Sequence, residues 1–184
     1  MAGYAAFFRG INVGGKNIVK MKDLVKLFTD LGFEKVKSYL QSGNVVFESE
    51  EAEAEMKKRI RTAFTDRFGF ESVVILRSGK EITDLIDAMP YTEKEIQAAR
   101  ETDLQAKHLY VFLLETEPDM QLVDRAVKHA EGTDLLHCGK RELFLLCDQS
   151  IRLSKLARET AKLFDTATAR NWKTLCSIQK MLIT

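Results

Sequence analysis

The 184-residue chain is long enough for one domain or two small ones, and its composition is that of an ordinary globular protein. Its 28 basic and 27 acidic residues leave a formal charge of +1, so a nucleic-acid-binding role would need a locally concentrated basic patch. No apolar run is long enough to cross a bilayer, and the N-terminal residues lack the pattern of a signal peptide. We therefore expect a soluble, cytoplasmic protein with no membrane partner.

Cysteine and histidine usage favours neither disulfides nor a metal. Cys138, Cys147 and Cys176 are odd in number and show no CxxC spacing, which predicts reduced thiols in the cytoplasm. His129 and His137 are not at a spacing typical of a metal site, so we expect no zinc centre. No cofactor is indicated.

The first 78 residues predict the order β-α-β-β-α-β. The elements alternate between apolar runs and amphipathic stripes: a strand over Tyr4–Phe8, a helix from Met21 to Leu31 ended by Gly32, a hairpin of Lys35–Leu40 and Asn44–Glu48, a helix from Met56 to Phe64 closed near Gly69, and a strand over Ser72–Arg77. This order is that of the ferredoxin-like fold, in which two helices cover one face of the sheet. The apolar first strand suggests that the other face is covered as well.

Residues 79–106 are interpreted as a helical connector. Ser78 with Glu81 and Thr92 with Glu95 are two candidate capping boxes, and Pro90 ends the first short helix.

Residues 107–184 predict a second half in which most of this order of strands and helices is repeated. Its elements are a strand over Leu109–Leu114, a helix from Leu122 to Ala130 stopped by Gly132, a hairpin of Leu135–Cys138 and Glu142–Cys147, and helices around Leu156 and Leu175. This half thus ends in a helix where the first half has a strand. The predicted fold class is α+β: two ferredoxin-like halves (β-α-β-β-α-β type) with antiparallel sheets, helices on one face and an extra C-terminal helix.

The segment Arg9 to Asn17 directly follows the first predicted strand and is the first candidate for a site. Its glycines, among them Gly14 and Gly15, let a ligand approach the main chain, and Arg9, Asn12 and Lys16 add charge and an amide. Such a loop suits a phosphate or carboxylate. It nearly spells a P-loop, but Asn17 stands where a Ser or Thr should bind magnesium, and the strand order is wrong.

Two further polar segments are candidates. Gln41, Ser42 and Asn44 surround the tip of the first hairpin, where Gln41 has no obvious role in a turn. Because we expect the first loop and this turn at opposite ends of the sheet, the first half alone does not predict a shared pocket. The third segment, Thr166–Lys173, is interpreted as the start of the last helix, with Thr168 as N-cap and Arg170, Asn171 and Lys173 in the first turn.

Together, the segments Arg9–Asn17, Gln41–Phe47 and Thr168–Thr174 resemble a bacterial family known as domain of unknown function 1697. The motifs occur in the family's order and spacing, and the resemblance covers nearly the whole chain. Family members usually carry Thr where this chain has Ala169 and Asn where it has Lys173. The resemblance implies a fold and a kinship but no established activity. The motif residues that it carries over as a candidate ligand site are Arg9, Asn12, Gly14, Gly15, Lys16, Gln41, Ser42, Asn44, Arg170 and Asn171.

Three functions are compatible with these motifs. The favoured hypothesis is binding of a small anionic or phosphate-bearing ligand. The three motifs contain no pair of a nucleophile and a base, so whether the protein is an enzyme stays open, with Asp148 as one carboxylate candidate. The second is RNA binding, because the same strand order builds the RRM and Phe7, Phe8 and Phe47 lie on the relevant strands. Nucleic acid is not favoured, given the neutral charge. The third is a non-catalytic interaction module. The oligomeric state is left open.

Overall fold

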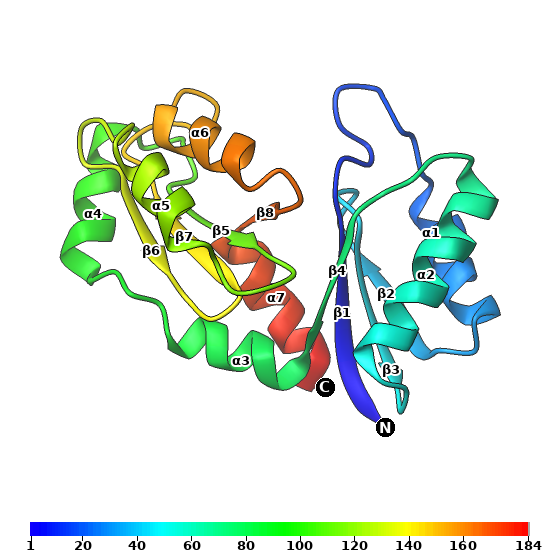
Figure 1. Ribbon diagram of the computed structural model, residues 1–184. Coiled ribbons are helices and arrows are strands. Elements are labelled where there is room, and N and C mark those ends of the chain that lie inside the picture. Colours follow the sequence, from blue (N-terminus) through cyan, green and yellow to red (C-terminus); the bar gives the residue numbers. More distant parts are fainter. Residues whose placement is uncertain (184) are drawn as a thin grey trace. The chain divides into compact units, whose positions relative to one another are not determined.

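In the computed structural model, which describes residues 1–183, the chain divides into two compact units with the same plan of strands (Figure 1). The first unit comprises residues 1–84 together with the segment from Cys176 onwards, and the second comprises Leu85–Leu175. Each unit contains one four-stranded antiparallel sheet.

The first sheet confirms the predicted ferredoxin-like order. The elements are β1 (Ala2–Phe8), α1 (Met21–Asp30), β2 (Glu34–Tyr39), β3 (Asn44–Ser49), α2 (Glu53–Phe68), β4 (Val74–Ser78) and α3 (Gly79–Asp87). Its strands lie in the order β2-β3-β1-β4, and every neighbouring pair is antiparallel. The helices α1 and α2 lie on one face of this sheet (Figure 1).

The second sheet repeats this order. The remaining elements are α4 (Glu93–Thr102), β5 (Leu109–Leu113), α5 (Met120–Val127), β6 (Leu135–Cys138), β7 (Glu142–Leu146), α6 (Lys155–Leu163), β8 (Thr168–Asn171) and α7 (Trp172–Ile183). The strand order is β6-β7-β5-β8, again with antiparallel neighbours. The expectation that this half ends in a helix where the first half has a strand was wrong, because β8 precedes α7 and completes the repeat.

Both faces of the first sheet are buried, as the apolar first strand suggests. Ala6 and Phe8 of β1 face the helices, where Phe8 stacks on Phe64 with 5.0 Å between ring centroids. The alternate residues Ala5 and Phe7 point to the opposite face, since successive side chains of a strand alternate, and they are buried too. Burial on both sides explains why β1 is apolar throughout instead of alternating with polar residues.

Within the first unit, the end of α7 packs against the sheet. The Tyr39 hydroxyl on β2 is 3.0 Å from the Ser177 hydroxyl, and Leu182 lies against Gly3 of β1, where an added Cβ would be 3.3 Å from Leu182 Cδ2. The C-terminal helix is therefore part of the packing of the N-terminal sheet.

Both predicted capping boxes are present. Ser78 and Glu81 exchange hydrogen bonds at the start of α3, with 3.2 Å from the Glu81 amide to Ser78 Oγ and 2.9 Å from the Ser78 amide to Glu81 Oε2. Thr92 and Glu95 do the same for α4. No helix in residues 1–183 has both the length and the apolar character needed to cross a membrane.

The three thiols differ in accessibility, which predicts three different reactivities. Cys138 is exposed and Cys176 half-buried, whereas Cys147 is buried and burial raises the pKa of its thiol to about 12. We expect a thiol reagent at pH 8 to label Cys138 first and Cys147 only after denaturation, because the neutral thiol is a poor nucleophile. Mass spectrometry of labelled peptides at successive times gives the order, with Cys138→Ser as control. Rapid labelling of Cys147 in the folded protein would contradict the buried position.

The same raised pKa has a consequence for stability. The folded protein holds the Cys147 proton more tightly than the unfolded chain, so this contribution to the free energy of unfolding is complete below pH 9.0. It is then lost as pH rises towards about 12.

Candidate functional site

The loop from Arg9 to Lys20 closes on itself before α1 begins. The Asn12 amide donates to Asn17 O (3.1 Å), the Lys16 amide to Val13 O (3.1 Å), and Asn17 Nδ2 to Gly10 O (3.1 Å). Gly14 and Gly15 occupy the tip with φ of +59° and +74°, positive at both central positions as in a type I′ turn. The loop is thus a small hairpin that does not lead directly into a helix, and the antiparallel sheet beside it also differs from that of a P-loop protein.

The side chain of Asn12 joins this loop to the β2–β3 turn. Its Nδ2 donates to Val19 O (2.9 Å) and to Gln41 O (2.8 Å), and its Oδ1 accepts from the Val19 amide (2.8 Å). The expectation that loop and turn lie at opposite ends of the sheet was therefore wrong. β1 and β3 run antiparallel with Phe7 opposite Asn44, so the end of β1 and the start of β3 meet at the same edge.

Two other motif residues build the turn itself. Asn44 is fully buried, and its Nδ2 lies 2.9 Å from both Tyr39 O and Ser42 Oγ. Gly43 has φ of +74°, and its carbonyl accepts from the Phe8 amide (2.9 Å). A Cβ on Gly43 would come within 2.6 Å of Ile11 Cδ1, so only glycine fits here. Asn44 and Gly43 therefore determine the conformation of the turn, and both are buried from solvent.

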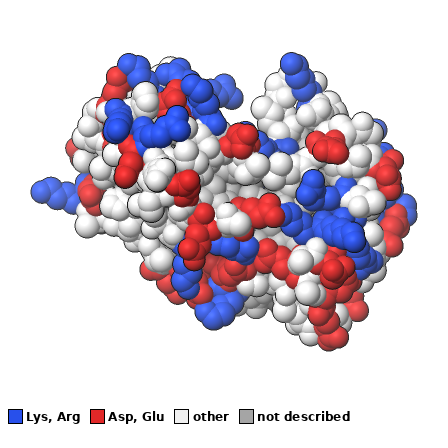
Figure 2. All heavy atoms as spheres, in the orientation of Figure 1, with Lys and Arg blue, Asp and Glu red and all other residues white. Residues whose placement is uncertain are grey.

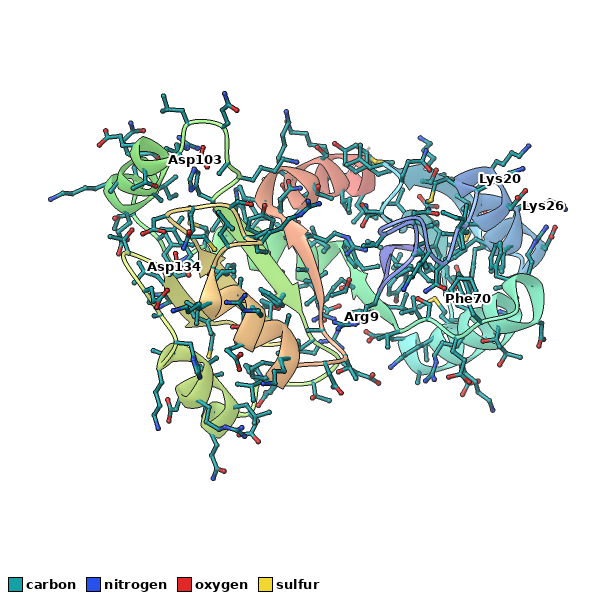
Figure 3. All side chains as sticks on the ribbon, turned by 90° about the horizontal axis from the view of Figure 1, so that it is seen from above. Arg9, Lys20, Lys26, Phe70, Asp103 and Asp134 are labelled. Carbon is teal, nitrogen blue, oxygen red and sulfur yellow. The ribbon has the colours of Figure 1, made fainter. Side chains whose placement is uncertain are left out.

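Several candidate residues at this edge expose polar or cationic groups to solvent. Lys16, Gln41 and Ser42 are exposed, as are Gly14 and Gly15 at the tip of the loop. Arg9 at the end of β1 is half-buried (Figure 3), its amide donates to Val73 O (2.9 Å), and its carbonyl accepts from Ser72 Oγ (2.9 Å). Five of the ten candidate residues are thus exposed at one edge of the first sheet, and a sixth, Arg9, is half-buried there.

Arg170 and Asn171 belong to the second unit and have local partners. Arg170 is 8% exposed, and its Nη1 donates to Thr168 Oγ1 (2.7 Å) and Ala169 O (2.8 Å). Burial lowers its pKa to about 10, so the side chain is still cationic at neutral pH. Asn171 Oδ1 accepts from the Thr174 amide (3.1 Å) and caps α7. The prediction that Thr168 caps the last helix, with Arg170 and Asn171 in its first turn, was wrong, because Thr168–Asn171 is a strand. The placement of Lys173 in the first turn is confirmed, since α7 begins at Trp172.

Arg77 is a counterpart of Arg170 that the sequence did not reveal. Arg77 on β4 pairs with Ala5 on β1, and Arg170 on β8 pairs with Val111 on β5. The two arginines therefore occupy equivalent positions in the two sheets. Each donates from Nη1 to the carbonyl of the preceding residue at 2.8 Å, and each precedes a residue that caps a helix. Arg77 could be found from the sequence by aligning the two halves so that the ends of β4 and β8 coincide. Repetition of the buried arginine favours a structural role in both units.

The aromatic residues of the RNA-binding hypothesis are not available for stacking. Phe7, Phe8 and Phe47 are all buried, and Phe8 and Phe47 lie in the cluster under α1 and α2. An RRM instead stacks bases on exposed aromatic rings of its central strands. These three rings therefore cannot stack on RNA bases in the way that an RRM does.

The candidate carboxylate Asp148 has hydrogen-bond partners in its own loops. Asp148 Oδ2 accepts from the Thr133 amide (3.1 Å), and the Asp148 amide donates to Asp134 Oδ1 (3.0 Å), so this carboxylate lies within a network of loop hydrogen bonds. Over residues 1–183, no group of three His, Cys, Asp or Glu side chains is placed to hold a metal ion.

Two ferredoxin-like units, with a self-closed glycine loop at one edge of the first sheet, define an α+β protein of a duplicated type. The chain belongs to a family described as proteins of unknown function (DUF1697), whose pattern matches residues 1–144, so the family that the motifs resemble is confirmed. The third motif, Thr168–Thr174, lies beyond the matched residues. It is also similar to the structure of the conserved bacterial protein SP0830 from Streptococcus pneumoniae, at 29% identity with a TM-score of 0.75 and 98% of each chain covered. No curated protein matches the chain.

Replacing Asn12 should loosen both segments that its side chain joins. We expect Asn12→Ala to lower the free energy of unfolding by about 2–3 kcal/mol, because Val19 and Gln41 lose hydrogen bonds and alanine is strained at φ of +56°. Asn12→Gly separates the two effects, since it removes the side chain without the backbone strain. Urea denaturation measures both variants. Equal stability of wild type and Asn12→Gly would show that the hydrogen bonds contribute nothing.

Two glycines of the site predict contrasting costs. Gly43→Ala should destabilise the protein by about 3 kcal/mol, because the new methyl group meets Ile11 and Phe8 in addition to the positive φ. Gly14→Ala meets no atom within 4 Å and should cost only about 1 kcal/mol from its φ of +59°. Thermal unfolding of the pair measures the difference. A Gly43→Ala protein as stable as Gly14→Ala would contradict the close contact.

Proposed function

We propose that the protein binds a small anionic ligand, such as a phosphate-bearing compound, at the edge of the first sheet formed by the Arg9–Lys20 loop and the β2–β3 turn. The observation that supports this most directly is the hydrogen bond from Asn12 Nδ2 to Gln41 O, which joins the two polar segments. A site held in place in advance loses less conformational entropy when a ligand binds.

The charge at this edge favours an anion. Residues 9–22 and 35–47 contain six Lys or Arg and no Asp or Glu, although the whole chain has a formal charge of only +1. Lys35 pairs with Glu48 at 2.8 Å, whereas Lys16 and Lys20 are exposed and make no ion pair within the described chain. The local excess of cationic side chains in these two segments therefore favours an anion.

The main chain supplies donors as well. The amides of Gly14 and Gly15 have no hydrogen-bond partner within residues 1–183, and both residues are exposed. Successive free amides in a turn form a concave anion site, and Lys16 adjoins them in sequence. Gln41 and Ser42 add an amide and a hydroxyl that can orient a ligand. In this proposal Asn12 and Asn44 position the site, Arg9 contributes charge, and Arg170 and Asn171 act in the fold of the second unit.

The proposal is tested by measuring the binding of inorganic phosphate to the wild type and to variants in which a single lysine is replaced. We expect phosphate to raise the Tm of the wild type, and Lys16→Ala to weaken binding about tenfold, because a charge-assisted hydrogen bond is lost. Lys58→Ala is the matched control, since it removes an exposed lysine of α2 in the same unit. Thermal shift and titration calorimetry measure both. Equal affinities of the two variants would refute the assignment of Lys16, and a wild type that binds neither inorganic phosphate nor any phosphate ester or anionic lipid would refute the site.

A further inference from the structure

The edge that Asn12 holds together also carries exposed apolar side chains. Of the large hydrophobic residues exposed in the described part of the first unit, three lie away from the chain ends: Val13, Ile18 and Leu40, with exposures of 64%, 65% and 56%. Val13 follows Asn12, Ile18 precedes Val19, and Leu40 precedes Gln41. Each therefore adjoins Asn12 or a residue that the Asn12 side chain binds. All three therefore lie next to residues that the hydrogen bonds of Asn12 connect.

Leu40 has a backbone conformation that disfavours its own side chain. Its φ is +56°, in the left-handed region where a branched residue clashes with its own main chain. Asn or Gly would adopt this conformation at lower cost, and the exposed leucine gains little from packing. A strained residue with no visible benefit to the fold is a candidate for function.

Cations flank these apolar side chains. Lys16 lies between Val13 and Ile18 in sequence, and Lys20 is the residue directly before α1 (Figure 3). Figure 2 shows basic atoms at the far end of the loop between β1 and α1, with mainly uncharged atoms next to them. A surface that is both apolar and cationic is complementary to a molecule with an apolar and an anionic part.

We infer that the ligand of this site is an amphiphilic anion: a phosphate monoester whose organic group is apolar. The phosphate would bind the Gly14–Gly15 amides and Lys16, and the apolar group would cover Val13, Ile18 and Leu40. This inference rests on the proposed anion site and adds the class of ligand. Two sources share the chemistry, a soluble phosphate ester and the headgroup region of an anionic lipid.

Titration calorimetry with inorganic phosphate, methyl phosphate and hexyl phosphate tests the inference. We expect hexyl phosphate to bind the wild type about tenfold more tightly than methyl phosphate, because only its chain covers apolar surface. Equal affinities for the two esters would overturn the inference and leave the anion site standing. Failure of all three compounds to bind, with no binding to phosphatidic acid vesicles either, would overturn both.

The variant Leu40→Asn separates ligand binding from folding. It should abolish most of the preference for hexyl phosphate, keep the affinity for methyl phosphate, and raise the Tm by about 2 °C as the strain is relieved. Leu104→Asn, which replaces an exposed leucine in a turn of the second unit, should leave the preference unchanged. An unaltered hexyl preference in Leu40→Asn would overturn the assignment of the apolar group to this edge.

Vesicle co-sedimentation distinguishes the two sources. Phosphatidylcholine vesicles with and without phosphatidic acid are compared, using the wild type and Leu40→Asn. Binding only to vesicles with phosphatidic acid, lost in Leu40→Asn, supports an amphiphilic anion supplied by a lipid. Binding of hexyl phosphate without co-sedimentation supports a soluble ester.

Discussion

The candidate site depends on the antiparallel pairing of β1 with β3, which brings the end of one strand to the start of the other. The side chain of Asn12 lies at this edge and makes three hydrogen bonds, two with Val19 at the end of the loop and one with Gln41 in the hairpin turn. Because buried and half-buried polar groups are costly to leave without partners, these bonds fix the two segments in one arrangement. The exposed amides, cations and apolar side chains owe their common location to this constraint.

Because the two units repeat the same strand order, a polar residue in one unit can be compared with the residue at the equivalent position of the other. Asn44 opens β3 opposite Phe7, and Glu142 opens β7 opposite Leu113, at equivalent positions. Both are buried and turn back to their own hairpin, Asn44 to Tyr39 O and Glu142 Oε1 to the Lys140 amide at 2.7 Å. A polar residue that recurs in both units with the same local task is best explained by folding. Asn12 and Lys16 belong to a loop that is special to the first unit, which favours them as residues of function.

Local features of the fold were predictable from the sequence, and features set by distant pairing were not. The capping boxes at Ser78 and Thr92 involve residues three positions apart, so they can be recognised directly. The strand β8 has only four residues, and Thr168 imitates a helix N-cap, so the segment was interpreted as helix. The partners of Asn12 lie 7 and 29 residues away, beyond any local pattern. The shared edge of loop and turn did follow from the predicted topology, and the contrary expectation was a mistake in applying it. The candidate ligand residues themselves stay a prediction.

The position of α7 affects the order in which the protein can form. The helix begins at Trp172 in the second unit, yet Ser177 and Leu182 pack in the first, against strands made from the opposite end of the chain. A growing chain would therefore lack these contacts on the first sheet until the segment from Cys176 leaves the ribosome. Closure over such a long sequence separation is slow relative to local folding. The first unit, although it is synthesised first, is the last to be complete.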